Sequence, residues 1–354
     1  MGRYKRVTSH DVAREAGVSI TTVSFVLNNV ESGKISEDTK RRVLDAVRKL
    51  NYVPDFFAKG LKTGRSNTLG IIVPSITNPF FASIVQGAGD SARQEGYNLI
   101  VTSTYRERLT EAACVDFLLE RQVDAILVPA TMNPSLIEKL KKVETGIVVY
   151  NGELDQLDVS CVTTDNFRGG WLVSKHLIEL GHHQIAFLSP PLSNPVRESR
   201  FAGFQRGLLD GGFRLSPDYV MISDFEGELP DVNYDYSTGY NLASDLFKRT
   251  SGKYPIAIFA FNDMLALGVI RAAADAGLRI PEDISLVGYD DIFVAALVHP
   301  GLTTIHQPKY HLGASAARLA IEHLDEEHRD RSGQRVVFQP QLRVRNSTAR
   351  VDCG

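Results

Sequence analysis

Residues 8–28 read Thr-Ser-His-Asp-Val-Ala-Arg-Glu-Ala-Gly-Val-Ser-Ile-Thr-Thr-Val-Ser-Phe-Val-Leu-Asn, and they decide the fold of the N-terminal part. Thr8, with Asp11 three residues later, is a capping-box signal for a helix start. Gly17 supplies a positive φ where that helix ends, and Ser19 caps a second helix directly afterwards. Two short helices around a tight glycine-containing turn predict a helix-turn-helix unit.

Charge separates this region from the rest of the chain. A third amphipathic helix begins at Ser36, and basic residues cover its polar face. Residues 1–65 hold 13 Lys and Arg against 7 Asp and Glu, a net charge of +6, whereas the whole chain of 354 residues carries −3. The remainder therefore carries −9. A basic head on an acidic body favours DNA as a partner of the head over a small helical bundle with merely solvated charges.

The second helix of a helix-turn-helix unit lies in the major groove, where its N-terminal side chains face the base edges. Here those side chains are Ile20, Thr21, Ser24 and Phe25. Two of the four are apolar, so we expect this helix to read thymine methyls and DNA shape more than guanine edges. Four further residues, with Lys34 close to a base edge, are expected to position the DNA backbone: Asn28, Lys34, Asn51 and Tyr52.

Residues 54–66 follow the head as a hinge and linker. Pro54 suits a helix start, but Gly60 lowers the helix propensity by about 1 kcal/mol relative to Ala, and two turns are marginal alone. A plain interdomain linker is one interpretation. The other is a hinge helix that forms on DNA, with Leu61 as a minor-groove wedge and Lys62 beside a phosphate.

The head and hinge resemble those of the LacI/GalR family of bacterial repressors, in order and in spacing. The matching strings are Thr8…Asp11-Val12-Ala13, Ala16-Gly17-Val18-Ser19, Thr22-Val23-Ser24, Leu27-Asn28 and Asn51-Tyr52-x-Pro54…Ala58…Leu61. The resemblance adds Thr8 and Ala58 to the expected DNA-binding residues. It also marks Phe25 as a departure, because the family usually has a polar base-reading residue at that position.

From Thr68 onwards, short apolar runs alternate with longer helical patterns, which predicts a doubly wound α/β body. The runs are continuously apolar, as in parallel strands that are covered on both faces. The expected strands are Leu69–Val73, Leu99–Thr102, Ala125–Val128, Ile147–Tyr150, Cys161–Thr163, Ile185–Leu188, Ile256–Phe261 and Leu286–Gly288. The expected helices include Phe80–Gln94, Gly169–Leu180, Arg200–Leu209, Met264–Ala276 and Leu312–Leu324.

Motifs of the body resemble the same family, whose regulatory part is similar to periplasmic sugar-binding proteins. They include Asn78-Pro79-Phe80-Phe81, Arg200-Phe-Ala-Gly203-Phe204, Phe261-Asn262-Asp263 and Gly288-Tyr-Asp290-Asp291. The resemblance implies two lobes that are joined by three crossings around an effector cleft. The expected domains are a head at 1–53, a hinge at 54–66, an effector-binding and dimerisation domain at 67–347 and a tail at 348–354. Within that domain, the first lobe is expected at 67–162 and 308–328, the second at 163–307 and 329–347.

Polar residues at the ends of buried parallel strands border the ligand crevice of an open α/β sheet. Asn262 and Asp290 fit this rule, and we favour ligand contact for both over a role as helix N-caps, which we assign to Asp263. Arg200 is either a surface ion pair or, by resemblance, the effector-binding Arg. The expected effector-binding residues are Phe80, Phe81, Asn151, Arg200, Phe225, Asn262 and Asp290.

The acidic, tyrosine-containing stretch 226–236 departs from the family pattern. We expect it to be a solvated loop, with a second hypothesis that it borders the cleft and disfavours anionic effectors. The tail 348–354 has no leucine heptads, so a coiled-coil tetramer is not expected.

Enzymes, metal sites and cofactors are disfavoured. The glycine-rich string at 87–92 resembles a dinucleotide fingerprint but falls inside a helical pattern, and no nucleophile elbow is present. Cys114, Cys161 and Cys353 lie too far apart for a zinc site or a disulfide framework, which fits a reducing, cytoplasmic compartment. Neither a secretory signal nor a membrane-spanning segment is expected.

The sequence therefore predicts a homodimeric transcription regulator, most simply a repressor. It is expected to bind a pseudo-palindromic operator in double-stranded DNA under the control of a small polar effector, such as a sugar or a related metabolite. Two alternatives stay open at this point: control by a protein partner, and a small-molecule-binding protein with no DNA role.

Overall fold

The computed structural model describes residues 7–27, 35–52, 65–143, 145–152, 158–224, 233–250, 256–325 and 333–351. Its contacts divide the chain into two compact units, Met1–Ser66 and Asn67–Gly354. Among the described residues, no helix combines the length and the apolar character needed to cross a membrane.

The first unit is a three-helix head, with α1 at Ser9–Ala16, α2 at Ile20–Leu27 and α3 at Glu37–Lys49. Thr8 and Asp11 form the reciprocal capping box at the start of α1, and Gly17 ends that helix in the left-handed conformation with φ 65°. Val12, Val23 and Val43, one from each helix, meet in a small apolar core. The predicted helix-turn-helix architecture is confirmed.

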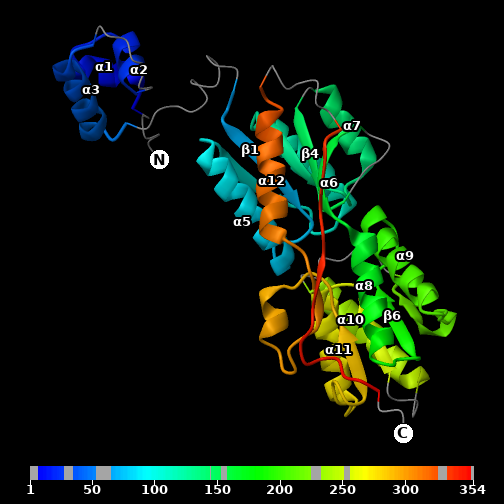
Figure 1. Ribbon diagram of the computed structural model, residues 1–354. Helices are drawn as coiled ribbons and strands as arrows, with labels where there is room; N and C mark the ends of the chain where they lie inside the picture. Colours follow the sequence, from blue (N-terminus) through cyan, green and yellow to red (C-terminus); the bar gives the residue numbers. More distant parts are fainter. Residues whose placement is uncertain are drawn as a thin grey trace. The chain divides into compact units, whose positions relative to one another are not determined.

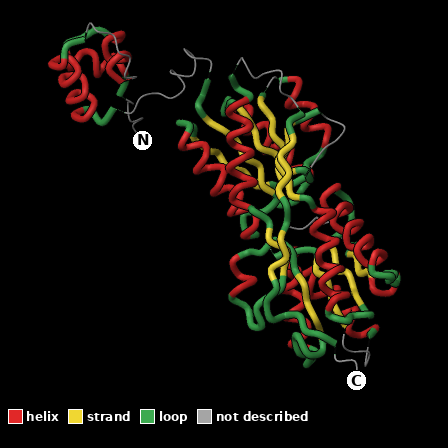
Figure 2. Tube along the Cα trace, in the orientation of Figure 1, coloured by secondary structure: helices red, strands yellow, loops and turns green. Residues whose placement is uncertain are grey.

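The first lobe of the second unit is built on a six-stranded parallel sheet of order β11-β5-β4-β3-β1-β2. Figures 1 and 2 show the strands of this lobe with helices beside them. Its strands are β1 (Thr68–Val73), β2 (Asn98–Ser103), β3 (Ala125–Pro129), β4 (Gly146–Tyr150), β5 (Ser160–Thr164) and β11 (Arg335–Phe338). Side chains alternate between its faces: Leu69 and Ile71 pack in the core under α5 (Pro79–Gln94) and α12 (Lys309–Glu322). Ile72 packs in the core under α6 (Arg108–Glu120) and α7 (Pro134–Lys142).

Glycines allow α5 and α12, which lie side by side in Figure 1, to approach closely. A Cβ atom at Gly87 would lie 1.9 Å from the carbonyl oxygen of Tyr310, and one at Gly313 would lie 1.9 Å from that of Ile84. The glycine-rich string at 87–92 therefore serves helix packing within α5, as its helical pattern indicated.

The second lobe has a four-stranded parallel sheet of order β7-β6-β8-β9. Its strands are β6 (Ile185–Ser189), β7 (Val220–Ile222), β8 (Ile256–Ala260) and β9 (Ile284–Val287). Phe187 and Phe259 face the core under α8 (Asn166–Glu179) and α9 (Pro195–Asp210). The opposite face packs against α10 (Tyr234–Arg249) and α11 (Asp263–Asp275). An antiparallel pair, β10 (Thr304–His306) and β12 (Gln341–Arg343), lies beside β9.

The chain crosses between the lobes after β5, between β10 and α12, and between β11 and β12. Lys309–Glu322 form α12, which packs on the sheet of the first lobe. The assignment of all of 329–347 to the second lobe is wrong, because Val336 in β11 pairs with Val162 in β5. Pairing with β11 covers an edge of β5 that would otherwise leave its N–H and C=O groups exposed. The third crossing therefore lies after Phe338.

Candidate ligand cleft and nucleic-acid interface

A cavity of about 720 Å³ lies between the two lobes. This volume is within the range of small-molecule sites in proteins. Both lobes contribute to its wall, and six of the seven expected effector-binding residues line it: Phe80, Phe81, Asn151, Arg200, Asn262 and Asp290. The seventh, Phe225, lies outside the described residues.

Arg200 is held in α9 with only 2% of its surface exposed, so the interpretation as a surface ion pair is wrong. One terminal nitrogen donates to the carbonyl oxygen of Phe261 at 2.5 Å, and the other donates to Oδ1 of Asn166 at 3.0 Å. Its guanidinium stacks over the ring of Tyr289, 3.4 Å from the centroid, and burial lowers its pKa. Nε is buried without a hydrogen-bond partner among the described residues, which leaves a donor for a ligand.

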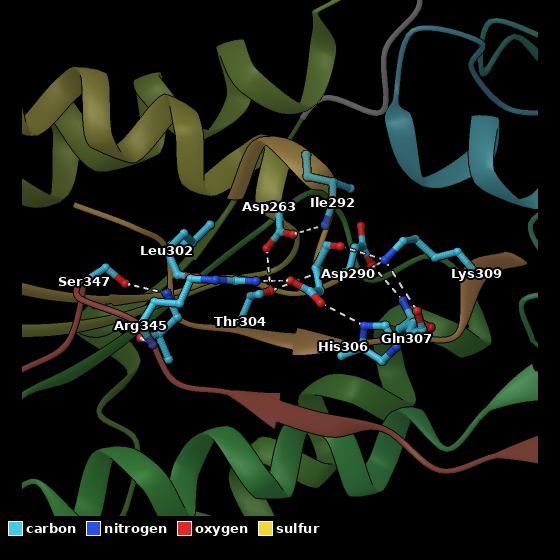
Figure 3. A network of polar contacts seen from close by, with 12 residues as sticks. Asp263, Asp290, Ile292, Leu302, Thr304, His306, Gln307, Lys309, Arg345 and Ser347 are labelled. Carbon is cyan, nitrogen blue, oxygen red and sulfur yellow. Dashed lines mark hydrogen bonds and ion pairs between the residues drawn. The ribbon is translucent and has the colours of Figure 1, made fainter. Parts of the chain in front are cut away.

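Asp290 follows β9 in the left-handed region, with φ 113°, and it is 5% exposed. Its Oδ1 accepts a hydrogen bond from Nε2 of Gln307 at 2.7 Å (Figure 3). Burial raises the pKa of Asp290 to about 6, against the lowering effect of nearby Arg200 and Lys309. A carboxylate at the wall of the cavity therefore also contacts the crossing that leads into α12.

Asn262 serves both as part of the cavity wall and as a helix N-cap. It lines the cavity, and its Oδ1 also caps α11 by accepting from the backbone N–H of Leu265 at 2.8 Å. The expectation that Asp263 is the cap is wrong, because the extended backbone that an N-cap requires occurs at Asn262, with φ −145° and ψ 172°. Asp263 is instead fully buried and accepts from the N–H of Ile292 and the hydroxyl of Thr304, at 2.8 and 2.5 Å.

The aromatic wall comes from the start of α5, which Asn78 caps. The rings of Phe80 and Phe81 meet edge to face, 5.1 Å between centroids, and both residues also belong to the core. Asn151 directly follows β4 with φ 55°, and its Oδ1 is buried without a partner among the described residues. An amide oxygen of this kind accepts hydrogen bonds from hydroxyl or amine groups.

Sequence reasoning missed most of the other residues that line the cavity, among them the cations Arg106 and Arg197. It also misjudged the end of the acidic stretch. Tyr234–Tyr236 form the first turn of α10, so the solvated-loop expectation is wrong for them. Tyr234 lines the cavity and Asp235 is 6% exposed, which agrees with the hypothesis that the stretch borders the cleft. Residues 226–232 lie outside the described residues. The helical pattern at 237–240, directly after Tyr236, was the signal that could have placed Tyr234–Tyr236 in a helix.

The head presents the start of α2 to solvent. Ile20 is 39% exposed and Thr21 is exposed, whereas Ser24 and Phe25 are half-buried. Thr8 is the N-cap of α1, where its side chain accepts a hydrogen bond from the backbone N–H of Asp11. Asn51 is exposed, Tyr52 packs against the head core, and five expected DNA-binding residues lie outside the described residues: Asn28, Lys34, Ala58, Leu61 and Lys62.

A helix-turn-helix head, joined in one chain to a two-lobed unit with a cavity between its lobes, defines a ligand-responsive DNA-binding protein. The sequence profile for bacterial regulatory proteins of the lacI family matches residues 8–55, and that for a periplasmic binding protein-like domain matches residues 174–348. The HTH-type transcriptional repressor PurR of Aliivibrio fischeri is 34% identical over 346 residues, which are 97% of this chain and 98% of the relative. The chain therefore belongs to the lacI family of bacterial regulatory proteins, and it is a transcription regulator rather than an enzyme.

Solved structures agree with this assignment. The lac repressor dimer bound to operator and the anti-inducer ONPF has a TM-score of 0.83 and 27% identity, over 98% of this chain and all of that chain. The complex of the regulator CelR with cellobiose has a TM-score of 0.71 and 28% identity, over 97% of this chain and all of that chain.

Proposed function

We propose that the chain is a repressor that binds a pseudo-palindromic operator as a homodimer, and that a small, uncharged, polar effector in the cleft sets its operator affinity. The observation that carries this proposal is the 720 Å³ cavity, whose wall comes from both lobes. A ligand that contacts both lobes binds their closed arrangement better than an open one, and this difference is what shifts a two-state equilibrium.

The wall of the cavity favours an uncharged effector. Its charged side chains come in equal numbers of each sign: Arg106, Arg197, Arg200, Glu107, Glu111 and Asp290. Neither sign of charge is in excess, so the wall does not favour an ionic ligand. Apolar surface for a ring comes from Phe80, Phe261 and Tyr234. Buried acceptors and donors beside aromatic faces suit a sugar or a related metabolite, such as a nucleobase or nucleoside.

The DNA part of the proposal rests on the exposed start of α2 and on the relatives. A lac repressor dimer on its operator is among the similar structures, and heads of a twofold dimer fit two half-sites about one helical turn apart. In our proposal the hinge segments 55–62 of two protomers pair on the DNA, with Leu61 opening the central base step. Since the partner is chromosomal DNA, the site of action is the cytoplasm.

A thermal-shift screen of the full chain tests the effector. Sugars, nucleobases, nucleosides and their phosphates are added one at a time, because a ligand that binds only the folded state stabilises it by about 2.7 kcal/mol at a hundred times its Kd. We expect a rise in Tm with an uncharged compound and none with its phosphate. If every compound fails and a phosphoprotein changes operator affinity instead, control by a protein partner replaces this proposal.

A further inference from the structure

Asp235 receives hydrogen bonds from both lobes on a single oxygen atom. It lies in the first turn of α10 in the second lobe. Its Oδ2 accepts from Nη2 of Arg106 at 2.7 Å and from Nδ2 of Asn78 at 3.3 Å, and both donors belong to the first lobe. Asn262 of the second lobe donates to the same oxygen at 3.1 Å. The other oxygen, Oδ1, is buried with no partner among the described residues.

Burial makes these bonds energetically important. The side chain of Asp235 is 5% exposed and that of Arg106 is 20% exposed, so water screens the pair far less than an ion pair on the surface. A buried carboxylate that loses its cationic partner keeps its desolvation penalty without compensation. Because Oδ1 has no partner within the described part of the chain, the charge depends on the bonds to Oδ2. Separation of the lobes would break the two bonds that come from the first lobe.

The bridge also forms part of the cavity wall. Asn78, Arg106 and Tyr234 line the main cavity and, together with Asp235, a second hollow of about 30 Å³. The guanidinium of Arg106 lies over the ring of Tyr234, 5.3 Å from its centroid, which adds a second contact across the lobes. The bridge residues therefore border both hollows and join the lobes at the same point.

We propose that Arg106, Asn78 and Asp235 form an inter-lobe latch that holds the cleft closed when no ligand is bound. The latch sets the balance between open and closed lobes. If the proposed function holds, the latch also sets the apparent affinity for an effector, because that affinity scales with the population of the binding-competent state. Arg106 and Asp235 are positioning residues in this device.

Single-molecule FRET on the ligand-free full chain tests the latch. Dyes are attached at Glu120→Cys in the first lobe and Glu282→Cys in the second, both exposed, in a Cys353→Ser background. Cys114 and Cys161 are buried and remain unlabelled in the folded protein. Labelled chain is diluted into unlabelled chain, so that a dimer carries at most one labelled protomer.

We expect Arg106→Gln and Asp235→Asn each to raise the ratio of open to closed molecules about tenfold, the factor for 1.4 kcal/mol. The double variant should open the lobes no further than either single one, because both remove the same interaction. Arg106→Lys, which keeps the charge, should restore most of the closed population. The matched control is Lys139→Gln, which removes the 2.5 Å ion pair with Asp116 inside the first lobe and should leave the distribution unchanged.

Unchanged distributions in both Arg106→Gln and Asp235→Asn would overturn the latch. If Asp235→Asn fails to fold, Arg106→Gln decides alone, because its side chain lies on a loop before α6 and is partly exposed. The experiment contains neither DNA nor ligand. The latch can therefore fail while the proposed function stands, and the thermal-shift screen can fail while the latch stands.

Discussion

Nζ of Lys309 lies 2.6 Å from the backbone oxygen of Asp290, to which it donates a hydrogen bond. Lys309 is the first residue of α12 in the first lobe, whereas Asp290 lines the cavity from the second lobe. The same ammonium group donates to the backbone oxygen of Asp291 at 2.7 Å, and burial lowers the pKa of Lys309. A ligand that moves Asp290 therefore acts directly on the residue where α12 begins.

Asp290→Asn should change how stability depends on pH. Burial raises the pKa of Asp290 to about 6 in the folded state, so between about pH 4 and 6 the folded chain keeps a proton that the unfolded chain has lost. The contribution of this group is therefore greatest below pH 4 and declines as the pH rises to 6. We expect the Tm of Asp290→Asn relative to that of the parent to rise between pH 4 and pH 7, as measured by differential scanning calorimetry.

Asp283→Asn is the matched control, with the opposite sign. Hydrogen bonds from Arg279 lower the pKa of Asp283, so its contribution is present above pH 4 and is lost on acidification. The Tm of Asp283→Asn relative to that of the parent should therefore fall as the pH rises. Parallel curves for parent and Asp290→Asn would contradict the raised pKa.

Arg200→Ala should abolish the response of operator binding to the compound that the thermal-shift screen selects. Arg200 is stacked on Tyr289, and its Nε has no partner in the described ranges, so its loss removes a donor and opens a space beside the cavity. Operator affinity without ligand, measured by fluorescence anisotropy, should stay within about twofold. Arg206→Ala on the same helix, where Arg206 pairs with Asp210 at the surface, should respond normally. A normal response in Arg200→Ala would remove this residue from the site.

Gly87→Ala should destabilise the first lobe. Its Cβ would lie 1.9 Å from the carbonyl oxygen of Tyr310, so α5 and α12 must separate, and overpacking of this kind destabilises by about 1–3 kcal/mol or more. Gly89→Ala in the same helix meets nothing closer than 3.7 Å and should be neutral or stabilise by up to about 1 kcal/mol. Urea unfolding of both variants measures the difference, and equal midpoints would refute the close helix contact.

Operator affinity should fall steeply with salt. Residues 1–65 carry a net charge of +6, and two heads that contact six or more phosphates lose about a thousandfold in affinity between 50 and 200 mM salt. Fluorescence anisotropy with a labelled operator measures the slope. A flat dependence would count against the head as the DNA-binding unit.

Leu61→Ala should weaken binding to the operator by about tenfold or more and leave binding to unrelated DNA nearly unchanged, because a minor-groove wedge acts only on a specifically deformed site. Lys62→Ala is the control: a phosphate contact contributes to both kinds of DNA alike. Equal losses on both DNAs for Leu61→Ala would exclude the wedge.

Local patterns in the sequence determined the secondary structure well. The cap residues Thr8, Gly17 and Ser36 mark helix ends where the structure has them, and the eight apolar runs coincide with strands to within two residues at every end. These signals depend on neighbours within four residues along the chain, which is why they can be read without a fold. The strand-end rule and the family resemblance together also named six residues that line one cavity.

The tertiary structure alone decided three things: that β11 joins the first sheet, that Asn262 rather than Asp263 caps α11, and that Asp235 bridges the lobes. Val336 and Val162 are neighbours in space although 174 positions separate them, and Arg106 and Asp235 are 129 positions apart. No local sequence pattern predicts such pairs, because the two partners lie far apart in the sequence. Only the packing of whole lobes brings them into contact. The acidic residue that looked like part of a solvated loop is thus a buried bridge, since only the folded chain brings a cation and two amides to it.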